Sequence, residues 1–288
     1  MKDQIMKMFE DIIGVVVVYE VKLIESKTIN TLNSALSKIN CHLNLIVYDN
    51  SKKPDNQSYI NCFPNLVIHY INNPENPGLS KAYNYALRKA FEDNKKWILI
   101  LDQDTGIEPK YFKSLSEVFD PNNDKIVSYV PFLKSGDKII SPIVLSSGGY
   151  SRPLQTDFSG FASDKELSAI NSCSMVNVGI ARKLGGYPDE FPLDYLDHWF
   201  YKTAFDRGKY IYVLDCILCH HLSVNNINKI GIQRYSSIIS SEKKFIYMFN
   251  LQKGYRKRVI FRIIKLLLLL NFCKAWLNIK ILLEKDYK

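Results

Sequence analysis

Two carboxylates one residue apart follow an apolar run in this chain. Residues 97–101 (WILIL) have the length and composition of a buried strand, and Asp102 and Asp104 follow directly, before the turn residue Gly106. Hard oxygen ligands at this spacing suit Mg²⁺ or Mn²⁺, which usually keep water and substrate phosphates in their coordination shell. The pair alone also fits a strand-end turn with helix-capping acids, so the elements around it have to decide.

Strands and helices alternate along the first third of the chain. The patterns predict strands at residues 12–19, 43–48, 66–71 and 97–101, with helices at 25–39 and 79–91. This rhythm is typical of βαβ units and a parallel sheet, in which ligands bind beyond the carboxyl ends of the strands. Four residues are expected to converge there: Tyr19, Asp49, Gly78 and Asp102.

The rest of the chain is less regular. Residues 127–171 are rich in Ser, Gly and Pro and predict loops and hairpins over the sheet; they precede a buried strand (173–178), a helical segment (194–207) and a strand (210–214). We therefore expect an α/β fold with a Rossmann-like, mainly parallel central sheet flanked by helices. A catalytic domain is predicted at residues 1–224 and a basic helical C-terminal extension at 225–288.

Length, net charge and cysteine content limit the classes of protein to which this chain can belong. The 288 residues can bury a full core, and the net charge of +9 is concentrated in the basic tail, residues 253–288. No nucleic-acid-binding module accompanies this charge. The six cysteines are too sparse for a disulfide framework, and acids interrupt the N-terminus, which is unlike a signal peptide. A cytoplasmic location is the default expectation, and no apolar stretch is long enough to predict a spanning helix.

A series of short motifs occurs in a fixed order along the chain: VVVVY (15–19), VYDNS (47–51), NNPENPGLSKAYN (72–84), LILDQD (99–104), INSC (170–173), LGGY (184–187), LDYLD (193–197) and HHL (220–222). This series resembles glycosyltransferase family 2, which has the GT-A fold, and within it the bacterial rhamnosyltransferase-like proteins. Each is weak alone, but together they span residues 12–223. The resemblance implies a nucleotide-sugar half at about residues 1–106 and an acceptor half at about 107–224.

On the donor side, the resemblance implies that Tyr19 packs on the nucleobase and that Asp49 hydrogen-bonds it. Asn76 to Gly78 would form the loop beside the diphosphate, where a missing side chain lets backbone approach phosphate. Asn84, on the following helix, is the last donor-binding candidate.

The resemblance also implies the metal and the catalytic residues. Asp102 would reach the ribose side and the metal, Asp104 would be the direct ligand of Mn²⁺ or Mg²⁺, and His220 would lie near metal and diphosphate. Asp197 resembles the general base that takes the proton of the acceptor hydroxyl. The family's usual acid two positions further on is Trp199 here, and Asp194 is a second candidate for the base.

These residues together imply an inverting, metal-dependent glycosyltransferase. It would move a sugar, with rhamnose as one candidate, from a dTDP- or UDP-sugar to a saccharide or lipid-linked saccharide acceptor in cell-surface polysaccharide synthesis. A nucleotidyltransferase is the nearest enzymatic alternative, although the segment after the first strand lacks the expected glycine-rich loop. A non-catalytic sugar- or membrane-binding scaffold with a decayed site is the other alternative.

The basic tail suggests a further partner. A helical wheel places Arg258, Arg262, Lys265 and Lys280 on one side, with residues 266–270 (LLLLL) around the other. We expect such a helix to lie on the cytoplasmic face of a membrane with its cations toward anionic lipid heads. Packing on the catalytic domain or on a second subunit of a homodimer is the open alternative.

Overall fold

The computed structural model describes residues 2–54, 57–163, 166–220 and 230–284. The chain divides into two compact units. The first contains Met1–Pro142 and Pro153–His221, and the second contains Ile143–Arg152 and Leu222–Lys288. The predicted boundary between residues 224 and 225 lies outside the described residues.

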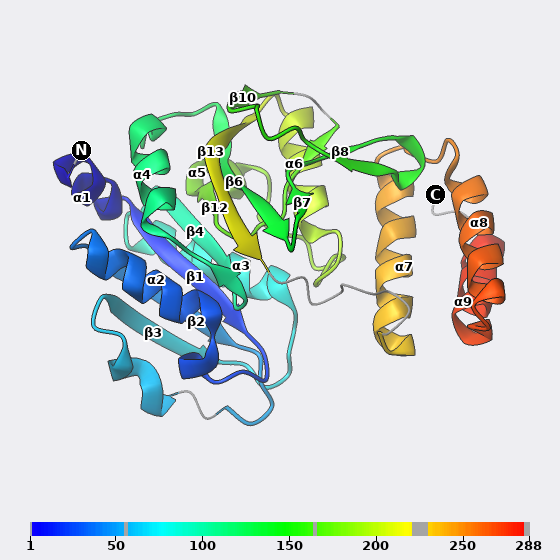
Figure 1. Ribbon diagram of the computed structural model, residues 1–288, viewed down its shortest axis with the longest axis horizontal. Coiled ribbons are helices and arrows are strands. Elements are labelled where there is room, and N and C mark those ends of the chain that lie inside the picture. The colour runs from blue at the N-terminus through cyan, green and yellow to red at the C-terminus, as the bar shows by residue number, and fades with distance from the viewer. Residues whose placement is uncertain (1, 55–56, 164–165, 221–229, 285–288) are drawn as a thin grey trace. The chain divides into compact units, whose positions relative to one another are not determined.

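A mixed, mainly parallel sheet forms the centre of the first unit, in the order β10-β13-β6-β12-β4-β1-β2-β3 (Figure 1). Its strands are β1 (Ile12–Val18), β2 (Leu43–Asp49), β3 (Leu66–Asn72), β4 (Trp97–Asp102), β6 (Ile126–Ser135), β10 (Gly160–Ala162), β12 (Ser174–Asn177) and β13 (Tyr210–His220), and two short strands pair at its margin, β5 (Thr105–Gly106) with β13 and β7 (Lys138–Ser141) with β6. Strands β3, β2, β1 and β4 are parallel, whereas β12 is antiparallel to both β4 and β6.

Helices cover both faces of this sheet. The first unit contains α1 (Lys2–Glu10), α2 (Lys27–Lys38), α3 (Leu79–Glu92), α4 (Pro109–Val118), α5 (Val178–Lys183) and α6 (Leu196–Asp206), with short 3-10 turns at Leu23–Glu25, Gln57–Cys62 and, in the second unit, Ser147–Gly149. Helices α1, α2 and α4 lie on one face, and α3, α5 and α6 lie on the other (Figure 1). This is the layered α/β fold that the alternation of patterns predicts.

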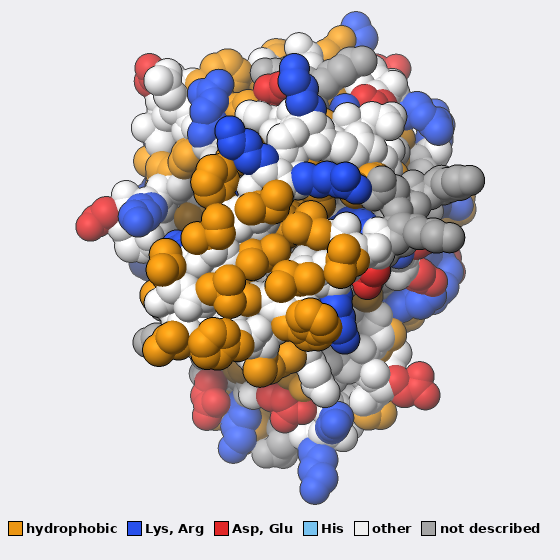
Figure 2. All heavy atoms as spheres, turned by 90° about the vertical axis from the view of Figure 1, so that its right-hand side faces the viewer, with side chains coloured by type: hydrophobic (Ala, Val, Ile, Leu, Met, Phe, Trp, Pro, Cys, Tyr) orange, Lys and Arg blue, Asp and Glu red, His pale blue; other side chains and the backbone are white. Residues whose placement is uncertain are grey.

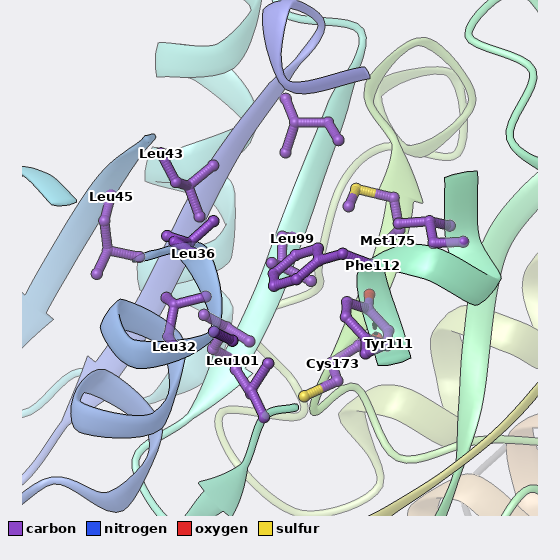
Figure 3. Packing of buried hydrophobic residues seen from close by; sticks show 14 of the residues in the cluster. Leu32, Leu36, Leu43, Leu45, Leu99, Leu101, Tyr111, Phe112, Cys173 and Met175 are labelled. Carbon is purple, nitrogen blue, oxygen red and sulfur yellow. Dashed lines mark hydrogen bonds between the residues drawn. The ribbon is translucent and has the colours of Figure 1, made fainter. Parts of the chain in front are cut away.

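Alternate residues of the central strands fill the core beneath α2 and α4. Leu99 and Leu101 of β4 point to the same face because side chains alternate along a strand, and they pack with Leu32 and Leu36 of α2 and Phe112 of α4 (Figure 3). All five side chains are essentially inaccessible to solvent. Packing of this kind fixes the register of β4 and therefore the position of the carboxylates at its end.

The sequence pattern does not predict one central strand, β6. Residues 127–171 were expected to form loops and hairpins, but they begin with β6, ten residues long and buried between β13 and β12. Pro131 and the following Ser/Gly-rich stretch obscure a strand that, like other buried strands, has no polar face to create alternation. Helices α1, α4 and α5 are also absent from the predictions, whereas every strand expected before residue 102 is present within one or two residues at either end.

The second unit combines β8 (Ile143–Leu145) and most of β9 (Ser151–Pro153) with the helices α7 (Ile232–Met248), α8 (Tyr255–Leu268) and α9 (Phe272–Leu283). A buried carboxylate, Glu242 of α7, joins two of these helices. It accepts two hydrogen bonds from Arg262 of α8, at 2.7 and 2.9 Å, and forms an ion pair with Arg258 at 2.9 Å. The prediction that Arg258 and Arg262 face outward was therefore wrong, because Glu242 holds both.

No helix among the described residues is both long enough and apolar enough to cross a bilayer.

Candidate active site

The carboxyl ends of the parallel strands gather the predicted acids. Strand β1 pairs with β2 on one side and β4 on the other, so that Asp49 lies opposite Val18 and Asp102 lies opposite Val17. The two acids thus flank the end of the same strand. This is the edge at which open α/β sheets bind ligands.

Three predicted residues come together as a group that could hold a metal ion. The potential ligand atoms of Asp102, Asp104 and His220 all lie within 4.8 Å of one another, and Asp104 Oδ1 is 3.5 Å from His220 Nδ1. Among the residues that the structure describes, no other three His, Cys, Asp or Glu side chains form such a group. Two carboxylates and one imidazole are a donor set that fits Mn²⁺ well. His221, the neighbouring histidine of the motif, lies outside the described residues.

A short antiparallel ladder brings the histidine to the acids. Thr105 of β5 pairs with His220 of β13, although the two residues are far apart in the sequence. The hydroxyl of Thr28, in the first turn of α2, accepts a hydrogen bond from the Thr105 N–H at 2.8 Å and lies close to the carbonyl oxygens of Asp102 and Thr105. Thr28 therefore fixes the turn that carries Asp104.

Two hydroxyl groups that the sequence does not single out form a chain that ends at the histidine. Thr105 Oγ1 lies 2.7 Å from His220 Nδ1 and 2.6 Å from Ser172 Oγ. Both hydroxyl-bearing residues are fully buried. Partners of this kind fix the orientation of a ligand imidazole. Thr105 follows directly after Asp104, but neither spacing nor periodicity distinguishes it from an ordinary strand residue.

The carboxylates influence one another electrostatically. Burial raises the pKa of Asp102 to about 7, the negative charges of Asp104 and Asp197 add to the effect, and a hydrogen bond with Ser172 opposes it. A like-charged cluster in partial burial favours a bound proton or a bound cation. Because the charge of Asp197 contributes to the raised pKa of Asp102, the two carboxyl groups are close enough to interact electrostatically.

Asp197 lies in the first turn of α6. Its side chain is partly buried, and Oδ1 accepts a hydrogen bond from the His198 N–H at 2.8 Å. The preceding Tyr195 has a left-handed backbone, with φ of 64°, which is unusual for a bulky residue. Such strain often accompanies functional positions and here sets the direction in which α6 begins.

The alternative base and the departure from the family pattern lie nearby. Asp194 is partly buried in the segment that leads into α6, and Trp199 is partly buried on the helix itself. Both Asp194 and Asp197 are partly buried near the start of α6, and the assignment of Asp197 as the general base stays a prediction.

Asp49 is fully buried at the end of β2. Its Oδ1 accepts a hydrogen bond from the Ser51 N–H at 2.8 Å, and its Oδ2 accepts one from the Tyr70 hydroxyl at 2.7 Å. Tyr19, by contrast, is 45% exposed, and its N–H donates to Gln103 Oε1 at 2.9 Å. Gln103, between the two metal-type acids, therefore ties the end of β1 to the metal-type turn.

The loop before α3 has a specific need for glycine. Gly78 has a φ of 94°, and a Cβ atom at this position would lie 2.3 Å from the carbonyl oxygen of Pro192. The missing side chain thus allows close approach of the protein's own backbone, where the sequence suggested a phosphate. Asn76 is exposed in the same loop with a φ of 48°.

Asn84 has a task that the sequence did not suggest. Its amide donates to the Tyr187 carbonyl at 2.7 Å and accepts from the Tyr187 N–H at 2.8 Å. It also leaves no room for a Cβ atom at Gly186, which has a φ of 75°. Asn84 therefore holds the Gly185–Tyr187 turn, and its contact with a donor sugar stays a prediction.

Comparison with known proteins identifies the family to which this site belongs. Residues 15–185 match the family described as Glycosyl transferase family 2, which is more than half of the chain. The chain belongs to glycosyltransferase family 2. This family 2 enzyme is 25% identical over 231 residues to a Shigella flexneri protein described as dTDP-rhamnosyl transferase RfbF, covering 78% of the present chain and 74% of that protein. The nucleotidyltransferase alternative falls away with this assignment.

Solved structures share the fold of the family 2 enzyme. A crystal structure of GalNAc-T7 with UDP, GalNAc and Mn²⁺ superposes with a TM-score of 0.55 at 12% identity, covering 87% of the present chain and 56% of that one. A crystal structure of S. aureus TarS gives 0.50 at 13% identity, with 85% and 43% covered. The present chain thus spans about half the length of these two proteins, and the likeness concerns the fold alone.

Proposed function

We propose that this family 2 enzyme is a metal-dependent, inverting glycosyltransferase. The observation that carries the proposal is the convergence of Asp102, Asp104 and His220 at one sheet edge, with the charge of Asp197 acting on the same cluster. Asp102, Asp104 and His220 would hold Mn²⁺ or Mg²⁺. When bound, the ion would supply positive charge beside the diphosphate as that group leaves.

The protein's own groups carry the remaining steps. Asp197, as a carboxylate, accepts the proton of the acceptor hydroxyl while that oxygen attacks the anomeric carbon. The bond from the anomeric carbon to the diphosphate oxygen breaks in the same displacement, so one attack from the opposite side inverts the configuration. Tyr19, exposed directly after β1, packs on the nucleobase. Asp49 is buried and already bonded to Ser51 and Tyr70, so its hydrogen bond to the base requires the Tyr70 hydroxyl to give way. The loop from Asn76 to Gly78 borders the diphosphate.

The donor is proposed to be a dTDP- or UDP-sugar, with rhamnose as the leading sugar. The support for rhamnose is the similarity, at 25% identity, to the Shigella flexneri protein described as a dTDP-rhamnosyl transferase. The acceptor is proposed to be a saccharide or lipid-linked saccharide of a cell-surface polysaccharide, used at the cytoplasmic face of the membrane.

A screen of nucleotide sugars tests this function. Ligands that bind the native state raise its melting temperature, so dTDP-rhamnose and a set of UDP-hexoses are compared with Mn²⁺ and with chelator. We expect one donor to raise the melting temperature of the protein, and to do so in Mn²⁺ but not in chelator. The enzyme should then turn over that donor in the presence of Mn²⁺. Asp215→Asn, an exposed acid on β13, is the control and should behave as the wild type. Undiminished turnover of that donor in excess chelator would rule out the metal-dependent mechanism.

A further inference from the structure

Helices α8 and α9 expose a continuous set of large apolar side chains, here called the apolar face. Figure 2 shows apolar side chains gathered in one patch on the second unit, with lysine and arginine side chains at the margin of the patch. Leu268 is 80% exposed and Leu270 is 75% exposed, which is far more than core-forming leucines show. The members are Ile260, Phe261, Ile264, Leu267, Leu268, Leu269, Leu270, Phe272 and Trp276.

The opposite side of the same helices is already packed. Val259 and Leu266 of α8 are buried with residues of α7 and α9, and Arg262 is held by Glu242. Lys243 of α7 donates a hydrogen bond to the carbonyl of Ile281 at 2.8 Å, at the carboxyl end of α9. The helices therefore have their core without the apolar face, and a contiguous exposed apolar surface of this kind marks an interaction site.

The turn between the helices carries a second signal. The Leu270 N–H donates to the Leu267 carbonyl at 3.0 Å, and the Asn271 N–H donates to the Leu266 carbonyl at 2.8 Å. This is a Schellman motif, whose left-handed position normally holds glycine or asparagine. Leu270 occupies that position with a φ of 54°. A bulky side chain here costs backbone energy and lies in solvent, so folding alone does not explain it.

Charge distinguishes between the partners that such a face could meet. Between Gln252 and Leu283 the sequence has eight lysines and arginines and no Asp or Glu. Lys257 lies 5.9 Å from the ring of Phe261, and Lys280 lies 5.9 Å from the ring of Trp276. Aromatic rings beside cations are typical of side chains at a bilayer interface. The other exposed cations are Lys253, Arg256 and Lys265.

We infer that the apolar face docks on an anionic phospholipid bilayer. Leu268, Leu270 and Trp276 would enter the boundary between headgroups and acyl chains, while Lys257 and Lys280 contact lipid phosphates. A second copy of the chain fits less well, because a symmetric dimer would bring the same cations together without any acid on these helices. The inference does not depend on the proposed reaction.

Flotation of the full chain with vesicles tests this inference. We expect binding to vesicles of phosphatidylcholine and phosphatidylglycerol, weak binding to phosphatidylcholine alone, and loss of binding as salt rises, because salt screens exposed charges. Leu270→Gly is the decisive variant. It should bind at least about tenfold more weakly, since one leucine side chain is lost from the bilayer. Its melting temperature should stay equal or rise, because glycine relieves the left-handed backbone.

Matched variants separate the lipid from other causes. Val67→Ser removes an exposed apolar side chain of β3, and Lys113→Glu reverses an exposed charge of α4; both should bind as the wild type. The double variant Lys257→Glu and Lys280→Glu should lose the preference for phosphatidylglycerol. The inference would be overturned if the wild-type protein did not bind anionic vesicles, or if Leu270→Gly bound them as tightly as the wild type. So would a dimer in sedimentation experiments that Leu270→Gly dissociates, because the apolar face would then belong to a second copy.

Discussion

The hydroxyl of Thr105 lies 2.7 Å from Nδ1 of His220, so the residue that directly follows the metal-type turn also orients the imidazole. Thr105 Oγ1 lies 2.6 Å from Ser172 as well, which makes it the centre of a buried polar chain. The position of His220 therefore depends on β5, on the segment that contains Ser172 and on β13 itself.

Thr105→Val should weaken Mn²⁺ binding about 10- to 100-fold, the usual effect of losing a group that orients a ligand histidine. Valine has a similar shape, so the free energy of unfolding should fall by only about 1–3 kcal/mol. Titration of Mn²⁺ with nucleotide present measures the affinity. Ser172→Ala leaves the Thr105–His220 contact in place but removes a hydrogen bond to Asp102, so any loss of Mn²⁺ affinity in that variant arises at the carboxylate and not at the imidazole. Equal affinities in wild type and Thr105→Val would show that this hydrogen bond does not position the imidazole.

Asp104→Asn should abolish divalent-dependent turnover while the protein remains folded, because an amide replaces the proposed direct ligand. Activity is measured across Mn²⁺ concentrations together with the melting temperature. Full activity in this variant, or wild-type activity in excess chelator, would contradict the metal proposal.

Asp197→Asn should retain donor binding and lose transfer by about 10²- to 10⁴-fold, the usual contribution of a positioned base. Asp206→Asn, at the other end of α6, serves as the control and should transfer normally. If Asp194→Asn is the severe change and Asp197→Asn is mild, Asp194 is the base. The product's anomeric configuration, read by NMR, tests inversion independently.

Asp102 should make stability depend on pH when metal is removed. Its pKa is raised to about 7 in the folded state, against about 4 in an unfolded chain. The folded state therefore binds this proton more tightly, so stability falls as pH rises from about 4 to 7 and then levels off. Urea unfolding in chelator measures this, as the difference between wild type and Asp102→Asn. A difference that is the same at every pH would contradict the raised pKa.

Arg262→Met should destabilise the second unit by on the order of 3 kcal/mol, because it leaves the buried Glu242 without its two-bond partner. Arg256→Met, an exposed change on the same helix, should cost much less. Denaturant unfolding followed by circular dichroism compares the two. Equal stabilities would mean that Arg258 alone compensates the charge of Glu242.

Local patterns in the sequence are sufficient to predict the central strands, the metal site and the family of this protein. The apolar runs before Tyr19, Asp49 and Asp102 predicted their strands, because a strand buried on both faces needs continuous apolar residues. Asp102 and Asp104, which follow the last of these runs, predicted a metal site, and the order of motifs indicated the family. Residues distant in the sequence needed the tertiary structure: pairing of β5 with β13 brings His220 to Asp104.

Tertiary contacts also decided which side each residue presents. Arg258 and Arg262 look like a solvent-facing stripe on a helical wheel, but a carboxylate on another helix turns them inward. The wheel depends only on the angle between residues, and it cannot contain the position of Glu242. Likewise, the glycine at position 78 predicts a close approach, but only the fold shows that Pro192 makes it. Sequence fixes local conformation through steric and hydrophobic preferences, whereas long-range pairing depends on which distant surfaces fit.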